Sequence, residues 1–312
     1  MHNSYQAWSL HQQAEQCNDL RRYDHAVELA KQALAIDPNF AHGYGSMCRA
    51  YIGLKQFKRA EKTARRALEL QSENEWFLRM LSISLRFQNR FRRALVPAQE
   101  CVRIAPMSAD SHIELAACLV ECRRFAKAHQ HLDKALELAP TAPAGHFAKG
   151  FLLLKQKQWQ LAEREFRLAL RLDPMDPLTV NNLGVCLNNQ KKYQDAALAF
   201  KSAVLLDPNM KLAKQNTLQT VDLMKSATPV KTALVILILI FVVVIGITTK
   251  EDTDPNQSDV FSDAVAIFVL VFACGILFLG SMHFWYRRRI HKQIESEDPE
   301  LHELYNRIKK HG

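Results

Sequence analysis

A period of 34 residues runs through the first two thirds of the chain and limits it to folds built from stacked repeats. The clearest unit spans residues 177–210 and contains two short stretches with apolar residues at helical spacing, among them Leu183, Leu187 and Phe200. It closes on an Asp-Pro pair, through which a helix does not continue. The same unit occurs five more times upstream without an insertion or deletion. Because neither helix of a unit can bury its apolar face alone, neighbouring units must pack on one another.

Four columns of the repeat keep one kind of side chain from unit to unit. Aromatic residues make up only 9% of the chain, yet one column is aromatic in all six units: Tyr23, Phe57, Phe91, Phe125, Trp159 and Tyr193. Three positions later comes an alanine column: Ala26, Ala60, Ala94, Ala128, Ala162 and Ala196. A third column is always small, as two closely crossing helices require: Ala14, Cys48, Ser82, Ala116, Gly150 and Gly184. The terminating column has Ser72 in one unit and proline in the others: Pro38, Pro106, Pro140, Pro174 and Pro208.

A 34-residue period with small, aromatic and proline columns at these positions resembles the tetratricopeptide repeat family. The resemblance covers residues 7–210 and implies an all-α fold, a right-handed superhelical solenoid of helix-turn-helix units. The expected units span residues 7–40, 41–74, 75–108, 109–142, 143–176 and 177–210. Two departures are visible. Val180 stands where the family usually has tryptophan, and Pro97 lies inside a second helix, which we expect to kink but to persist.

A further amphipathic helix is predicted at residues 211–226, with Leu212, Leu218, Val221 and Leu223 as its apolar residues. It resembles the extra helix that closes such arrays. We therefore expect it to cover the apolar edge of the sixth unit.

Two long apolar runs follow the repeats. Residues 232–249 carry no charged side chain and extend about 27 Å as a helix, which matches the hydrocarbon layer of a membrane. Residues 264–286 form a second run that closes with Trp285 and Tyr286, side chains typical of a membrane interface, before three arginines. The sequence therefore predicts two transmembrane helices and an integral membrane protein.

The flanking charges predict the orientation of these spans. The loop at residues 250–263 holds one lysine against five carboxylates, whereas lysines precede the first span and basic residues follow the second. Basic flanks remain on the cytoplasmic side, so we expect the repeats and the tail at residues 287–312 in the cytoplasm and the acidic loop outside. The lack of a secretory signal and the scattered spacing of seven cysteines agree with a reducing compartment. In a bacterium the membrane would be the inner one.

The tail contains Pro299, placed as a first helical residue, and then Leu301, Leu304 and Ile308 along one stripe. Three interpretations are open: a helix along the headgroups of the membrane, a helix docked on the repeats, and a solvated tail. A solvated tail or simple surface contact is favoured over a specific role.

No arrangement typical of catalysis is found in the sequence: phosphate-binding, nucleophile-elbow and HExxH motifs are missing. Cys118 and Cys122 lie one helical turn apart and would bind a metal only if His112, His129 and His131 converged on them. We expect core packing instead, since a free cysteine behaves as a small apolar residue. Turn-forming roles are expected for the recurring aspartates before proline: Asp37, Asp173 and Asp207. No catalytic residue, metal or cofactor is therefore predicted, and an enzyme is not expected.

Surface recognition remains as the expected function. In the tetratricopeptide family the first helix of each repeat lines a concave groove that binds a peptide or a partner's helix, and the resemblance places two sets of residues there. The amino-terminal set is cationic and aromatic: Trp8, His11, His42, Arg49, Trp76, Arg79 and Arg86. The second set is apolar with asparagines: Ile113, Val120, Phe147, Phe151, Leu154, Asn181, Asn182, Val185 and Asn188. The first set suits an acidic segment, and the second suits an amphipathic helix or an apolar peptide whose backbone Asn181 and Asn182 would bind. The alternative is that several apolar residues of the second set pack between repeats.

A basic cluster is expected on the turns and second helices, which form the outer surface in this family: Lys55, Lys58, Arg59, Lys62, Arg65, Arg66, Arg90, Arg92 and Arg93. It belongs to a part of the chain, residues 1–226, with 32 Lys and Arg against 22 Asp and Glu. Because no stacking aromatics accompany the cluster, nucleic acid is not expected as a partner. Anionic lipid headgroups, an acidic protein or solvent are the expected surroundings.

These features predict a membrane-tethered scaffold that binds a protein or peptide in the groove of its repeats. The lysine and asparagine pattern with which one subgroup of the family clamps chaperone tails is missing from any three successive repeats. A second hypothesis is an assembly or accessory subunit of an integral membrane complex, acting through its two transmembrane helices with Gly246, Gly275 and Gly280 at close helix contacts. Neither hypothesis fixes the oligomeric state.

Overall fold

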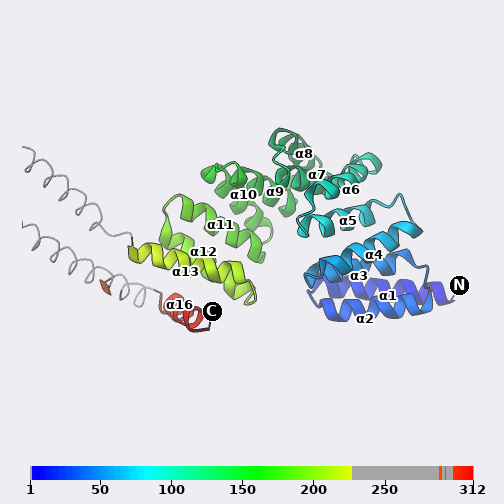
Figure 1. Ribbon diagram of the computed structural model, residues 1–312, viewed down its shortest axis with the longest axis horizontal. Coiled ribbons are helices and arrows are strands. Elements are labelled where there is room, and N and C mark those ends of the chain that lie inside the picture. The colour runs from blue at the N-terminus through cyan, green and yellow to red at the C-terminus, as the bar shows by residue number, and fades with distance from the viewer. Residues whose placement is uncertain (1, 227–287, 290–291, 293–297, 312) are drawn as a thin grey trace, which may run out of the picture. The chain divides into compact units, whose positions relative to one another are not determined.

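A computed structural model describes residues 2–226, 288–289, 292 and 298–311, and these residues contain α-helices and no β-strand (Figure 1). The helices are α1 (His2–Asp19), α2 (Tyr23–Ile36), α3 (Ala41–Gly53), α4 (Phe57–Leu70), α5 (Glu75–Phe87), α6 (Phe91–Ile104), α7 (Ala109–Glu121), α8 (Phe125–Leu138), α9 (Pro143–Lys155), α10 (Trp159–Leu172), α11 (Pro177–Asn189), α12 (Tyr193–Leu206), α13 (Lys211–Ser226) and α16 (Pro299–His311). The chain divides into two compact units, Met1–Met175 with α1 to α10 and Asp176–Gly312 with α11 to α16. The all-α prediction is confirmed for the described residues, while the handedness of a superhelix stays a prediction.

The first unit consists of five helix pairs in which each helix packs on the next along the chain. The pairs follow the predicted repeat boundaries, except that α1 begins at His2, five residues before the expected start. Pro97 is buried inside α6, and the helix continues past it to Ile104, as predicted. The Asp-Pro turns also form as predicted, since the Asp37 and Asp173 side chains accept bonds from the backbone N–H groups two residues later, at 2.9 and 3.2 Å.

Every first helix ends in the same tight turn. One residue in each turn adopts the left-handed conformation, with φ between 57° and 64°: Arg21, Lys55, Asn89, Arg123, Lys157 and Lys191. The backbone N–H of the next residue bonds back over five positions, for example from Gln56 to the carbonyl of Tyr51 at 2.8 Å. This is the Schellman arrangement, in which the left-handed residue is usually glycine. Here five of the six positions are basic, so the turns place a row of positive charges on the protein.

The small column lies in the core between the two helices of each repeat. A Cβ added to Gly150 would lie 2.8 Å from the Phe166 ring, and one added to Gly184 would lie 2.7 Å from the Phe200 ring. Both phenylalanines are buried, and their column holds smaller side chains in the other repeats: Ala30, Ala64, Ala98 and Leu132. Large and small residues therefore compensate one another across the helix pair.

In the part of the second unit that the structure describes, the sixth helix pair is followed by two further helices, α13 and α16. As predicted, α13 packs on α12 and covers its apolar side. The apolar face differs from the predicted one, however, because Leu212 is exposed. The buried face of α13 consists of Val221, which was predicted, together with Ala213 and Thr217, which were not.

Helix α16 packs beside α12 and α13, although residues 227–298 separate α13 from α16 in the sequence (Figure 1). The side chains of Leu301 and Tyr305 are buried and pack with Ala197 and Val221. Pro299 is the first helical residue, as predicted. The favoured interpretation of a solvated tail or simple surface contact is therefore wrong for residues 298–311, and the docked interpretation holds.

Polar contacts fix the amino-terminal end of α16. The Asp298 carboxylate accepts a bond from the backbone N–H of Leu301 at 2.9 Å and lies 2.6 Å from the Lys201 ammonium. Lys201 also lies 3.0 Å from Glu300, and the Tyr305 hydroxyl donates to Asp222 at 3.0 Å. Two ionic contacts and one hydrogen bond thus join α16 to α12 and α13.

The predicted transmembrane helices at residues 232–249 and 264–286 and the acidic loop at residues 250–263 lie outside the described residues. Among the helices that the structure does describe, none is both long enough and apolar enough for a membrane span.

Candidate functional site

The predicted groove residues of the first unit lie on the first helices of five repeats, α1, α3, α5, α7 and α9, each packed on the next. We call the surface formed by these predicted residues the first-helix face. Its chemical character changes along the row of helices.

A cluster of rings lies at the α1, α3 and α5 end of the first-helix face: Trp8, His11, Phe40, His42, Trp76 and Phe77. The two histidine rings are 5.4 Å apart, and His42 stacks on Trp76 at 6.3 Å. Burial lowers the pKa of both imidazoles, so they are neutral at physiological pH. Trp8 is 42% exposed, which leaves part of the cluster open to a ligand. Phe40 and Phe77 were not among the predicted site residues.

The arginines of the first-helix face are paired with carboxylates of the chain itself. Arg49 lies 2.6 Å from Glu15 and 2.6 Å from Asp19, both on α1. Arg79 lies 2.5 Å from Asp110 of α7. These pairs join neighbouring first helices, and the positive charge that the sequence assigns to this surface is neutralised by them.

Arg86 belongs to a buried network between α5 and α7. Its Nε and Nη2 both donate to the Glu114 carboxylate at 3.1 Å, and the Ser82 hydroxyl donates to the same carboxylate at 2.8 Å. Burial alone would lower the pKa of the guanidinium, but the charge and hydrogen bonds of Glu114 raise it above its usual value. Separating a buried pair of this kind costs about 3–5 kcal/mol. Arg86 therefore holds the repeats together and is not available to an acidic ligand at low cost.

The apolar part of the first-helix face lies on α7 and α9. Phe147 and Phe151 are half-buried, with parallel rings 6.4 Å apart, and the Lys155 ammonium lies 4.9 Å from the Phe151 ring centre. Ile113 and Leu154 are half-buried as well. One residue, Val120, is fully packed in the core, as the alternative interpretation allows.

Family models described as tetratricopeptide repeat match residues 19–77 and 147–211. The two stretches together make up less than half of the chain, and both are similar to tetratricopeptide repeats. No curated protein matches the sequence.

Solved structures with tetratricopeptide folds share the architecture. A chain of the APC/C hetero-tetramer Cut9–Hcn1 is similar at 14% identity and a TM-score of 0.57, over 66% of this chain and 41% of that one. This protein thus spans less than half the length of that neighbour. The PilF protein of Pseudomonas aeruginosa is similar at 18% identity and a TM-score of 0.50, over 69% of this chain and 98% of PilF. The tetratricopeptide protein TTC0263 of Thermus thermophilus gives 20% identity and a TM-score of 0.51, over 62% and 99%. At these identities the likeness shows the fold alone.

The last tetratricopeptide repeat carries the four predicted groove residues of the second unit, all on α11. Asn181 is buried and accepts a bond from the Asn216 side chain of α13 at 2.9 Å, and Asn188 accepts one from Thr220 at 3.4 Å. Two of the predicted ligand-binding amides therefore connect α11 to α13. Asn182 and Val185 are half-buried.

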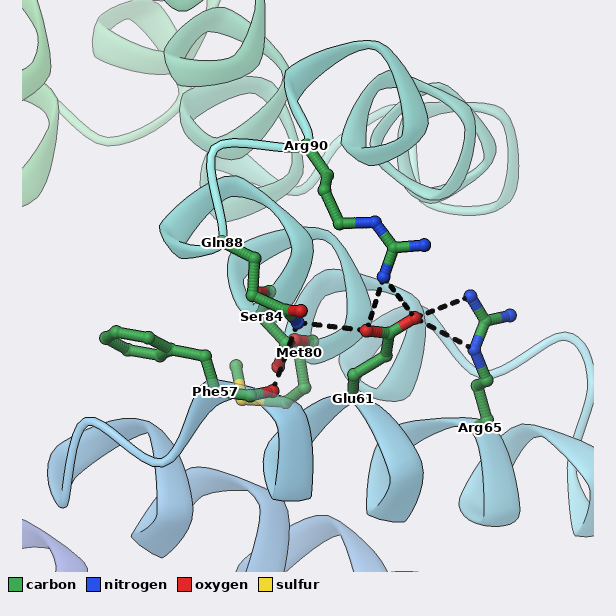
Figure 2. A network of polar contacts seen from close by, with 7 residues as sticks. All are labelled: Phe57, Glu61, Arg65, Met80, Ser84, Gln88 and Arg90. Carbon is green, nitrogen blue, oxygen red and sulfur yellow. Dashed lines mark hydrogen bonds and ion pairs between the residues drawn. The ribbon is translucent and has the colours of Figure 1, made fainter.

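On the turn side of the second and third repeats, Glu61 of α4 is the centre of a polar network (Figure 2). Its carboxylate lies 2.9 Å from Arg65 and 2.8 Å from Arg90, and the Gln88 side chain donates to it at 2.9 Å. Burial alone would raise the pKa of this carboxyl, but the hydrogen bonds of Arg65 and Gln88 and the charge of Arg90 lower it. Arg90, part of the predicted basic cluster, thus joins two adjacent repeats.

The candidate metal-binding residues do not assemble into a site. Cys118 lies in the hydrophobic core, as predicted, and its sulfur is 3.3 Å from the Ser82 hydroxyl. His112 and His131 contact each other through their Nδ1 atoms at 3.0 Å. Within the described ranges, no group of three possible ligands could hold a metal ion.

Proposed function

We propose that the chain is a scaffold whose tetratricopeptide repeats bind an apolar or aromatic peptide segment of a partner protein on the first-helix face. The observation that carries the proposal is the cluster of rings at α1, α3 and α5, in which two neighbouring neutral imidazoles lie against both Trp8 and Trp76, and Trp8 is 42% exposed. Rigid aromatic side chains bind a peptide at low entropic cost. The half-buried pair Phe147 and Phe151 extends the same chemistry to α9.

The ion pairs of Arg49, Arg79 and Arg86 narrow the choice of ligand. An acidic segment would have to displace carboxylates that are already in place at 2.5–3.1 Å. An apolar segment needs no such exchange. We therefore favour an apolar ligand on the first-helix face over the acidic one that composition alone suggests.

Photocrosslinking in intact cells tests this proposal. A photoreactive residue at Trp8, Phe147 or Phe151 is expected to capture the same partner, because all three side chains lie on the first-helix face. The matched control is Leu161 of α10, which is exposed but belongs to a second helix. Capture of one common set of proteins from Leu161 and from the three site positions would refute the assignment.

We further propose that the chain between α13 and α16 anchors the protein in a membrane and crosses it twice, with the repeats and the tail both cytoplasmic. Two observations support this. The apolar runs at residues 232–249 and 264–286 are long enough to span. In addition, α13 and α16 pack within one unit, so the intervening chain leaves and returns to the same body.

Single cysteines introduced in a background without the native ones test the topology. In intact cells, a membrane-impermeant maleimide is expected to label Asp252→Cys of the acidic loop. Lys310→Cys of α16 should react only after permeabilisation. The reverse labelling pattern, or recovery of the protein in the soluble fraction without detergent, would contradict the proposal.

A further inference from the structure

The turns of the third and fourth repeats form a hollow of about 750 Å³ in the first unit. It is lined by residues 89–93, in the turn after α5 and the first residues of α6, and by residues 121–124, at the end of α7 and in the turn before α8. Five of these nine residues are arginines. We call this site the arginine hollow.

Most of the charge in the arginine hollow is uncompensated. Four exposed side chains form no ion pair or side-chain hydrogen bond with any residue that the structure describes: Arg92, Arg93, Arg123 and Arg124. The fifth arginine, Arg90, is held by Glu61 (Figure 2). The one carboxylate in the lining, Glu121, lies 3.4 Å from Lys155. Four guanidinium groups are therefore gathered in one concave place without a partner.

The contrast with the first-helix face identifies the kind of ligand. There, Arg49, Arg79 and Arg86 are paired with carboxylates, so an acidic ligand meets a neutralised surface. In the arginine hollow it meets free guanidinium groups, which bind carboxylates through paired N–H donors. We propose that the arginine hollow binds an acidic peptide segment of a partner protein.

The spacing of the two turns fits an extended chain. Packed helices lie about 8–10 Å apart, so the arginine pairs of adjacent repeats are separated by roughly that distance. A peptide in the polyproline II conformation advances about 3.1 Å per residue with three residues per turn, so acidic side chains three positions apart lie on one side of it at a similar separation. Beyond the hollow, the left-handed residues Lys55 and Lys157 supply one exposed positive charge in each adjoining repeat. A segment with an acidic residue at every third position therefore matches this row of charges.

Peptide binding to the full chain in neutral detergent tests the proposal. The probe is a fluorescein-labelled twelve-residue peptide of glycine and serine with glutamate at every third position, followed by fluorescence anisotropy at low salt. Replacing its glutamates by glutamine should abolish binding, and added salt should weaken it. Equal binding of the glutamine peptide would overturn the proposal.

Charge-reversed variants locate the site. Arg92→Glu/Arg93→Glu and Arg123→Glu/Arg124→Glu are each expected to lower affinity about tenfold or more, because each removes one of the two arginine pairs. The control is Arg164→Glu/Arg171→Glu, which changes net charge equally at two exposed positions of α10. An equal loss in the control would show attraction to bulk charge and overturn the proposal. Far-ultraviolet circular dichroism confirms that each variant is folded.

Cys122 gives a second readout that bulk attraction would not produce. It is half-buried in the lining of the hollow. Burial raises the pKa of the Cys48 and Cys101 thiols to about 12, so these react slowly. In a Cys17→Ser/Cys274→Ser background, the acidic peptide should protect Cys122 from alkylation while the glutamine peptide does not. If phosphatidylserine vesicles or oligouridylate protect Cys122 and the acidic peptide does not, the ligand of the hollow is a lipid or an RNA and the proposal is refuted.

The arginine hollow is separate from the ring cluster of the first-helix face. Variants of the hollow should leave crosslinking from Trp8 unchanged. Failure of one proposal is therefore distinguishable from failure of the other.

Discussion

A Cβ at Gly150 would lie 2.8 Å from the ring of Phe166, closer than real side-chain carbons approach one another. In the fourth repeat the same two columns hold Ala116 and Leu132, both fully buried. A larger residue in the first helix of a repeat is thus matched by a smaller one in the second helix, so the two helices can pack in the same way in both repeats. At the scale of single residues, the identity of each small position is determined by the side chain across from it.

Gly150→Ala is accordingly expected to destabilise the protein by about 1–3 kcal/mol, since the Phe166 ring must shift in a packed core. Adding Phe166→Leu recreates the combination found in the fourth repeat and should recover part of the loss. Urea unfolding of both single variants and the double variant measures the coupling. Strictly additive losses would show that the two columns do not interact.

The left-handed turn residues allow a stabilising change. Lys157 has φ of 61°, a conformation that asparagine tolerates better than lysine and that Asn89 already adopts in the third repeat. Lys157→Asn should stabilise the protein by about 0.5–1 kcal/mol. In the control, Lys127→Asn at an exposed helical position of α8, weaker helix propensity should give no gain. Thermal unfolding compares the two, and a gain at Lys127 alone would contradict this account.

At the scale of elements, the helices were predictable because their signals are local: aromatic and small columns, a turn and a proline in each period. The pairing of groove arginines was missed because it joins residues one repeat apart. Arg49 and Glu15 occupy the same column, as do Lys155 and Glu121, so opposite charges 34 residues apart were the available signal for these two pairs. Asp110 lies 31 residues after Arg79 and Glu114 lies 28 after Arg86, so that signal does not find their pairs. Residues in the same column of adjacent first helices face each other. A charged side chain there can bind a ligand only where the facing residue is not its counter-ion.

The Glu61 network holds the second helix of one repeat to the turn of the next, and its strength should depend on pH. Because the pKa of this carboxyl is lowered on folding, its contribution to stability is present at pH values above its ordinary pKa. That contribution is lost as pH falls through the lowered pKa. Glu61→Gln should therefore cost about 1–2 kcal/mol near pH 7, with the difference from the parent protein shrinking towards pH 3.

Urea unfolding at both pH values checks this expectation. The control is Glu69→Gln, whose partner Arg66 and own side chain are both exposed, and it should leave the midpoint unchanged. A loss for Glu61→Gln that stays the same at both pH values would rule out the ionic explanation.

At the scale of the whole chain, the docking of α16 depends on residues far apart in sequence, and the stripe of Leu301, Leu304 and Ile308 alone did not reveal its target. Tyr305, which is buried and bonded to Asp222, lies outside that stripe as the sequence defines it. The receptor surface is formed jointly by α12 and α13, so neither helix by itself shows it. Local periodicity predicts the helix but not its destination.

Leu301→Ala and Tyr305→Ala should release α16, since they remove the side chains that pack on Ala197 and Val221. Amide hydrogen exchange of residues 299–311 is expected to rise sharply in both variants and to stay near the parent rate in the control Lys310→Ala, an exposed position. Unchanged protection in all three variants would show that the apolar contact does not hold the helix.

The ionic contacts of α16 predict when docking weakens. Burial alone would raise the pKa of Asp298, but hydrogen bonds from Lys201 and from the backbone lower it. Burial alone would lower the pKa of Lys201, but its bonds to Asp298 and Glu300 raise it. The contribution of Asp298 to stability is therefore lost as pH falls below the usual pKa of an aspartate and through the lowered one, and that of Lys201 is lost as pH rises above the usual pKa of a lysine and through the raised one. Exchange of α16 measured across this range should be slowest between the two limits.

Helix α16 also sets the order of events during biosynthesis. A ribosome completes α12 and α13 first and must translate the entire apolar segment before α16 can reach them. Until then, Ala197, Leu218 and Val221 lack the cover that Leu301 and Tyr305 provide. A nascent chain stalled before residue 298 would leave these apolar side chains exposed to chaperones and proteases, so closure of this unit reports that synthesis has passed α16.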